Sequence, residues 1–141
     1  MAQEVAVFIE NRPGRLKSIA AILSENAINV RTMIIHDRGQ FGLMKLIVDK
    51  PVQAYSFLSG KGFACVLKEI VAVMLDDKPG SFNRVVSVLS GHNVNILEAY
   101  GFVIEPGKKA VFCLEVKDTG TARDILKKEK FKLLEKELYE F

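Results

Sequence analysis

Short apolar runs alternate along the chain with longer segments in which apolar residues recur every three or four positions. The runs at residues 5–9 and 71–75 are rich in β-branched residues, so each is predicted to form a strand buried on at least one face. In the segment after each run, apolar residues follow the helical spacing, which predicts an amphipathic helix. The helical apolar positions are Leu16, Ile19, Ala20 and Leu23 in one segment and Phe82, Val85, Val86 and Leu89 in the other.

Each predicted helix is followed by a hairpin of two strands, a second helix and a final strand. Gly-containing turns mark the hairpins, and a Pro or a Thr marks the start of each second helix. The order βαββαβ is therefore predicted twice. The expected boundaries are helix ends near Asn26 and His92, hairpin turns at residues 37–39 and 105–108, second-helix starts at Pro51 and Thr119, and last strands from Phe63 and Phe131.

The two halves of the chain are copies of one unit. A shift of 66 positions aligns residues 5–30 with residues 71–96, and eight of the aligned positions are identical. After a two-residue insertion the match resumes at a shift of 68, which aligns residues 43–63 with residues 111–131. Self-similarity over nearly the whole chain indicates a tandem duplication.

We therefore predict two domains, residues 1–69 and residues 70–141. The predicted fold class is α+β. Each domain is expected to be a ferredoxin-like βαββαβ unit, in which one antiparallel sheet of four strands carries both helices on the same face.

Composition and charge narrow the range of functions. The chain has 141 residues and is 49% hydrophobic, which is enough for a buried core and excludes disorder. Its 20 Lys and Arg alternate closely with 17 Asp and Glu, as on a solvated surface and not as on a face that binds nucleic acid. The longest apolar stretches, of about six residues, are far shorter than the roughly 18 of a membrane span. The N-terminus does not resemble a signal peptide, so we expect a cytoplasmic protein.

Residues that could hold a metal are few and scattered. Cys65 and Cys113 lie in apolar, strand-like stretches without the spacing of a zinc site, and His36 and His92 do not occupy matching positions in the two copies. The two thiols are therefore expected in the core. Paired carboxylates and Ser-His-Asp arrangements are also missing, so we predict no metal, no cofactor and no catalytic residue.

The most informative motif is a Pro-Gly turn between the first strand and the first helix of each copy, ENRPGRL at residues 10–16 and DDKPGSF at residues 76–82. Backbone N–H groups at a helix start attract an anion such as a carboxylate. Gly14 and Gly80 lack a Cβ, so a ligand can approach closely, and Asn11 or Asp77 offers an oxygen acceptor to an ammonium group. Arg15 adds a partner for a carboxylate in the first copy. These groups suit the zwitterion of a free α-amino acid.

Two structural explanations compete with this interpretation. Pro-Gly after a strand is an ordinary way to turn a corner, and Asn or Asp two positions before Pro is a common turn or cap residue. Asn29 and Asn95 repeat at the start of the next strand, where an Asn at a helix exit commonly takes a left-handed conformation.

The strand, the (N/D)xPGx(L/F) turn, the helix and the LSxxxINV-like segment resemble the ACT domain, an amino-acid-sensing module with the βαββαβ fold. The resemblance covers both copies and nearly the whole chain. It implies that domains pair side by side into an eight-stranded sheet, with effector sites where the Pro-Gly loop of one domain meets the second-strand start of its neighbour. The implied ligand-binding residues are Asn11, Arg12, Pro13, Gly14, Arg15, Leu16, Asn29 and Val30, with Asp77, Lys78, Pro79, Gly80, Ser81, Phe82, Asn95 and Ile96 in the second copy.

The resemblance implies a stand-alone regulatory protein that binds an amino acid and passes the signal to a partner, such as an enzyme. Leu16 and Phe82 favour a ligand with an apolar or aromatic side chain. The first loop, with Arg12 and Arg15, is expected to be cationic, and the second, with Ser81, more neutral. Exposed sheet edges favour a homodimer.

Two other functions are compatible with this fold. A small hydrolase of the acylphosphatase type would use an Arg and an Asn, for which Arg15 and Asn29 are the candidates, although Arg15 has no equivalent in the second copy. An RNA-binding module would stack bases on aromatic residues of the open sheet face, but Phe8, Phe41 and Phe112 are scattered in the sequence, and no nucleic-acid partner is expected.

Overall fold

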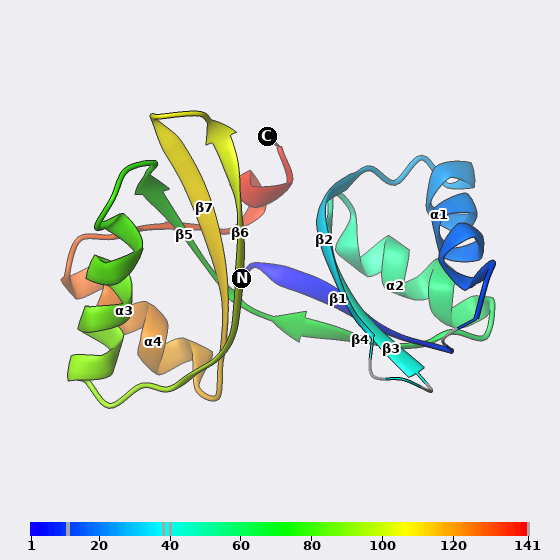
Figure 1. Ribbon diagram of the computed structural model, residues 1–141, viewed down its shortest axis with the longest axis horizontal. Helices are drawn as coiled ribbons and strands as arrows, with labels where there is room; N and C mark the ends of the chain where they lie inside the picture. Colours follow the sequence, from blue (N-terminus) through cyan, green and yellow to red (C-terminus); the bar gives the residue numbers. More distant parts are fainter. Residues whose placement is uncertain (11, 38, 40, 141) are drawn as a thin grey trace. The chain divides into compact units, whose positions relative to one another are not determined.

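The computed structural model describes residues 1–10, 12–37, 39 and 41–140. These residues form two compact units, a first unit of Gln3–Lys68 and a second unit of Glu69–Tyr139 together with Met1–Ala2. Each unit contains two helices and four strands in the order βαββαβ (Figure 1). The predicted fold class is therefore confirmed.

In the first unit the elements are β1 (Gln3–Glu10), α1 (Arg15–Glu25), β2 (Val30–Asp37), β3 (Phe41–Val48), α2 (Pro51–Gly60) and β4 (Ala64–Glu69). The strands form a sheet with the order β2-β3-β1-β4, in which β3 pairs antiparallel with both β1 and β2. Both helices lie on the same face of this sheet (Figure 1).

The second unit repeats this arrangement with β5 (Val71–Asp76), α3 (Ser81–Gly91), β6 (Ile96–Glu105), β7 (Lys109–Val116), α4 (Thr119–Lys128) and β8 (Lys132–Leu134). Its sheet has the order β6-β7-β5-β8, and all of its strand pairs are antiparallel. The described strands thus pair into two sheets of four. Among the described residues of one chain, no strand pairing joins these two sheets into the eight-stranded sheet that the resemblance implies.

The core of each unit lies between the sheet and its two helices. In the first unit, alternate residues of the central strands pack against the apolar positions of α1 and α2, among them Ile19, Leu23 and Leu58, which are almost fully buried. In the second unit, Val85 and Leu89 of α3 are fully buried in the same way. Periodicity therefore predicts the centre of each helix face correctly. Of the predicted apolar positions, Leu16, Ala20 and Phe82 are exposed.

The first helix of each unit ends at the predicted residue and is followed by a left-handed residue. Asn26 and His92 cap the first helices, as predicted. The left-handed residues at these helix exits are Ala27 and Asn93, with φ of 56° and 59°, so the alternative explanation of Asn29 and Asn95 as left-handed residues does not hold. The chain reverses two residues earlier because the backbone bonds from Ala27 and Ile28 to the last helical turn close there.

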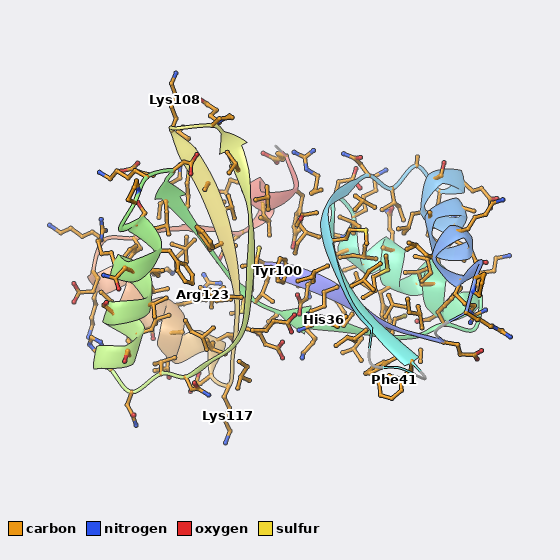
Figure 2. The ribbon with its side chains drawn as sticks, viewed as in Figure 1. His36, Phe41, Tyr100, Lys108, Lys117 and Arg123 are labelled. Carbon is orange, nitrogen blue, oxygen red and sulfur yellow. The ribbon has the colours of Figure 1, made fainter. Side chains whose placement is uncertain are left out.

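The chain ends in a segment that the periodicity does not predict. A short 3₁₀ helix, Lys136–Tyr139, follows β8 and buries Leu138 completely. Arg123 of α4 (Figure 2) forms an ion pair with Glu135, which precedes this helix. The hydrogen bond and positive charge from Arg123 lower the pKa of Glu135. Among the described residues, no helix is long and apolar enough to cross a membrane.

The two cysteines differ in burial. Cys113 on β7 is fully buried, in agreement with the expectation of a core thiol. Cys65 on β4 is only partly buried and packs at the margin of the first core. Its Sγ lies 3.0 Å from the Ser59 Oγ, so part of its environment is polar.

The first sheet carries a buried ion pair on the face away from its helices. Lys45 of β3 lies opposite Ala6 of β1, and its Nζ lies 3.6 Å from an Oε1 of Glu4. The exposed fractions of the two side chains are 3% and 0%. The equivalent residues of the second unit are Ile70 and Cys113, which are buried as well. One copy therefore uses charge where the other uses apolar packing.

Removing one partner of this pair is predicted to destabilise the protein far more than removing both. Lys45→Cys leaves the Glu4 carboxylate buried without its cation, which costs roughly 3–5 kcal/mol of the free energy of unfolding. The double variant Glu4→Ile with Lys45→Cys introduces the residues that the second unit has at these positions. Its free energy of unfolding is expected within about 1 kcal/mol of that of the parent protein. Urea denaturation under reducing conditions measures both values. Equal stability of Lys45→Cys and the parent would contradict the prediction.

Candidate functional site

The two Pro-Gly turns share one backbone geometry. Gly14 and Gly80 precede the first residues of α1 and α3 with φ of 90° in both cases. Residues other than Gly pay about 1–2 kcal/mol for a left-handed conformation. An added Cβ would meet no atom within 4 Å at either position. These glycines are therefore required by their conformation, independently of any ligand.

Asp77 holds the second turn against the neighbouring hairpin. Its Oδ2 accepts a hydrogen bond of 2.7 Å from the Gly107 N–H, and its own N–H donates to the Lys108 carbonyl at 3.1 Å. Lys108 lies at the tip of the β6–β7 hairpin (Figure 2). Asp77 therefore acts as a turn residue, which the sequence analysis gives as an alternative to ligand binding. Asn11, its counterpart, lies outside the described residues.

The strand-start residues are not part of the Pro-Gly cavities within their own units. The Asn29 N–H donates to Asp49 Oδ1 at 2.9 Å, and the Asp49 N–H donates to the Asn29 carbonyl at 3.1 Å. Asn29 and Asn95 are both exposed, and neither they nor Val30 and Ile96 line the cavities described below. Asn29, which the hydrolase alternative pairs with Arg15, is not among the residues that line the cavity of Arg15.

An arginine of the first helix lies over an equivalent phenylalanine in each unit. The Arg15 guanidinium carbon is 4.7 Å from the centre of the Phe63 ring, and that of Arg84 is 4.3 Å from the centre of the Phe131 ring. The rings match at a shift of 68, but Arg84 matches Ser18 and not Arg15. Helical residues three apart share one face, so arginines from successive turns reach the same ring.

The first unit has a small cavity between its Pro-Gly turn and its hairpin. The cavity has a volume of about 180 Å³. Its apolar wall includes Leu16, Ile9 of β1 and Ile35 of β2, and Arg12 and Arg15 are its basic residues. The Arg15 Nε is buried without a hydrogen-bond partner among the described residues. A small ligand with an anionic group and an apolar part fits this lining.

The equivalent region of the second unit has larger aromatic side chains. Phe82 replaces Leu16, and its ring packs on Phe112 with the ring centres 4.9 Å apart. Gly101 stands where the first unit has Ile35, and a Cβ on Gly101 would come within 2.9 Å of the Phe112 ring. Loss of a side chain at Gly101 therefore makes room for the aromatic pair.

A larger cavity of about 540 Å³ lies on another side of the second Pro-Gly turn. The prediction of a more neutral second loop concerned only the turn, with Asp77, Lys78 and Ser81. Outside the turn, the fold adds cations from the next helical turn, from β7 and from the start of β8. The charged lining residues are Asp76, Lys78, Arg84, Lys109, Lys130 and Lys132.

The structure thus brings together Arg12, Arg15 and Leu16 in one cavity and Lys78, Pro79, Gly80 and Ser81 in the other. The heptapeptides alone could not identify the remaining lining residues, because strand pairing brings those residues to the turn. One feature of the sequence does indicate the second cavity. Arg15 aligns with Ser81 and Ser18 aligns with Arg84, so each copy keeps one arginine in the first turn of its first helix.

The face of the first sheet away from its helices tests the RNA-binding alternative. Phe8 and Phe41 lie on the neighbouring strands β1 and β3, and both are about half exposed (Figure 2 labels Phe41). They are therefore less scattered than the sequence suggests. The charged residues beside them on these two strands are Glu4, Glu10 and Lys45, and Lys45 is buried against Glu4. The described residues of these two strands therefore offer no exposed basic side chain to a nucleic-acid backbone beside the rings.

Comparison with known proteins decides the family. The family model for the ACT domain pair matches residues 1–141. The chain belongs to the ACT domain pair family. This membership supports a regulatory, ligand-binding role. No curated protein sequence matches the chain.

Solved structures share the fold of this ACT domain pair. Protein BT0572 from Bacteroides thetaiotaomicron is 28% identical, with a TM-score of 0.93 over 99% of this chain and 96% of that one. The regulatory subunit of aspartate kinase from Thermus thermophilus is 15% identical, with a TM-score of 0.64 over 89% of this chain and 91% of that one. At this lower identity the likeness shows the fold alone.

The hydrogen bonds of Asp77 lead to a prediction about stability. Asp77→Ala deprives the Gly107 N–H of its acceptor and is expected to lower the free energy of unfolding by about 1–2 kcal/mol. Asp77→Asn keeps an acceptor oxygen and serves as the control, with less than half of that loss. Thermal and urea denaturation measure both variants. If Asp77→Ala and Asp77→Asn lose the same stability, the hydrogen bond to the hairpin is not what holds the turn.

Proposed function

We propose that this ACT domain pair is a regulatory protein that binds a free amino acid in the cavity of the first unit. The observation that carries the proposal is Arg15, whose guanidinium lies over Phe63 while its buried Nε has no hydrogen-bond partner among the described residues. A ligand carboxylate would supply the missing acceptor. The cavity of about 180 Å³ is smaller than the roughly 300–1,000 Å³ of sites for larger ligands, which supports a small metabolite.

Both charges of an amino acid have counterparts at this cavity. The Arg12 Nε lies 3.1 Å from Glu10 Oε2, and both side chains are more than half exposed. An exposed ion pair contributes about 0–1 kcal/mol, so a zwitterion can replace it at little cost. In the proposed complex the carboxylate binds Arg12 and Arg15, and the ammonium group binds Glu10.

The apolar wall determines which amino acids fit. Ile9, Leu16 and Ile35 offer no polar group to a ligand side chain, and a buried charge without a partner is costly. We propose a ligand with an apolar side chain, in agreement with the expectation from Leu16. Pro13 and Gly14 connect the lining residues Arg12 and Arg15 and are included in the proposed site, whereas Asn11 lies outside the described residues.

The second unit is proposed to bind the amino acid more weakly or not at all. Phe82 packs on Phe112 where the first unit has Leu16 beside its cavity. The ligand-binding residues that the resemblance implies for the second copy, which include Asp77 and Phe82, therefore differ from those of the first copy in the space they leave for a ligand and in their charge. The ligand signal is proposed to reach a partner enzyme in the cytoplasm through a change in the association of a homodimer, with no catalysis by this chain.

Titration calorimetry against the twenty amino acids tests the proposal. We expect binding of one or a few apolar amino acids, and at least a tenfold loss of affinity in Arg15→Lys, because Lys keeps the charge but loses the planar fork of donors. Arg84→Lys makes the same change over the equivalent ring of the second unit and is the matched control, with unchanged affinity. If none of the twenty binds at millimolar concentration, the proposed function is wrong.

A further inference from the structure

The cavity of the second unit concentrates positive charge. Five basic residues and one carboxylate line it, and the only ion pair among them joins Lys78 Nζ to Asp76 Oδ2 at 3.7 Å. Within the described residues, the other four basic residues have no carboxylate oxygen within 4 Å. These four are Arg84, Lys109, Lys130 and Lys132. Acidic residues nearby offset part of this charge, because the backbone N–H of Glu135 and the charge of Lys132 lower the pKa of Glu137, and Lys109 lies opposite Asp76 and Glu105 on the neighbouring strands. The lining itself still has five basic residues against one carboxylate, and a concave surface with an excess of cations attracts anions.

The first unit provides an internal comparison for this charge. At the positions of Arg84, Lys109, Lys130 and Lys132 it has Ser18, Phe41, Gly62 and Ala64. The fold therefore does not require cations at these positions. The basic residues also come from separate segments, namely α3, the start of β7, the α4–β8 connection and the start of β8. Only the folded unit brings them to one cavity, so they are not a local run of charge in the sequence.

Lys130 occupies a backbone conformation that is unfavourable for lysine. Its φ is 63°, and the equivalent Gly62 has a φ of 88°. The left-handed region is disfavoured for residues with a Cβ. Lys130 follows the C-cap of α4, so the helix exit imposes this conformation, as it does on Ala27 and Asn93. The second unit thus places a cation at the cavity in a position where glycine would be more stable.

Arg84 is held in an orientation suited to an oxyanion. Its guanidinium lies over the ring of Phe131, which is 7% exposed and packs into the core of the unit. Stacking occupies the face of the guanidinium and leaves the N–H groups at its edge available for two parallel bonds to phosphate or carboxylate oxygens. The buried ring therefore fixes the orientation of the donors.

We propose that this cavity binds a small phosphorylated molecule with at least two negative charges. The excess of cations favours phosphate over a single carboxylate, because a phosphate group presents up to two charges and three oxygen acceptors. The volume of about 540 Å³ falls within the range of cofactor and nucleotide-sized sites. The site lies in the other unit from the proposed amino-acid cavity, so it stands independently of the proposed function.

Calorimetric titration of the full chain with inorganic pyrophosphate and with ADP tests the proposal. Both probes are expected to bind, and their affinity is expected to fall several-fold between 50 and 200 mM salt through screening. Arg84→Lys is expected to weaken binding at least tenfold, and Arg15→Lys is the matched control with unchanged affinity. Stronger binding of ADP than of pyrophosphate would identify a nucleotide as the source of the phosphate, and equal binding would identify the phosphate groups alone.

Lys130→Gly separates a role in binding from a role in folding. Glycine relieves the backbone strain, so Tm is expected to rise while the affinity for pyrophosphate falls at least threefold. A rise in Tm with unchanged affinity would overturn the assignment of Lys130. The proposal as a whole is overturned if neither probe binds at millimolar concentration, if Arg15→Lys and Arg84→Lys weaken binding equally, or if a single-stranded oligonucleotide displaces ADP and binds more tightly. Failure of the amino-acid titration leaves these outcomes unchanged.

Discussion

In both units, a stacked arginine joins the first helix to the phenylalanine that precedes the last strand. Arg15 and Arg84 reach their rings from successive turns of the helix, so the stack is preserved although the residue that supplies it has moved. The position of the arginine affects which cavity is formed. Arg15 at the first helical residue lines the cavity beside the hairpin, whereas Arg84 one turn later lines the cavity beside the last strand.

The scaffold follows from sequence because each of its elements is specified locally. Apolar periodicity identifies the helices, and the matching Pro-Gly turns identify the points at which strand gives way to helix. The positive φ of Gly14 and Gly80 explains why those turns are repeated without any reference to a ligand. The last strand of the second unit is harder to predict, because β8 has only three residues and is followed by a 3₁₀ helix whose buried Leu138 has no periodic neighbours.

The turn residues of the candidate sites can be predicted from the sequence, but the lining residues on neighbouring strands cannot, because strand pairing brings them to the turn. Lys132 and Lys109 are far apart in the sequence, but they flank the same turn because β8 and β7 both pair with β5. The two heptapeptides by themselves therefore predict a more positive site in the first copy, although the cavity of the second copy has more basic lining residues. Ile35 was missed for the same reason, since its strand reaches the cavity through β3.

Duplication explains how one fold can hold two different cavities. Each copy keeps the turn, the helix faces and the arginine stack, which together maintain the backbone. The exchange of Ile35 for Gly101 and of Leu16 for Phe82 alters the space beside the hairpin, while the order of helices and strands stays the same. The second copy also keeps Lys130 in a left-handed conformation and collects cations that repel one another. Both features oppose stability, and the first copy has Ser18, Phe41, Gly62 and Ala64 at the equivalent positions. This difference between the copies agrees with the proposed anion site in the second unit.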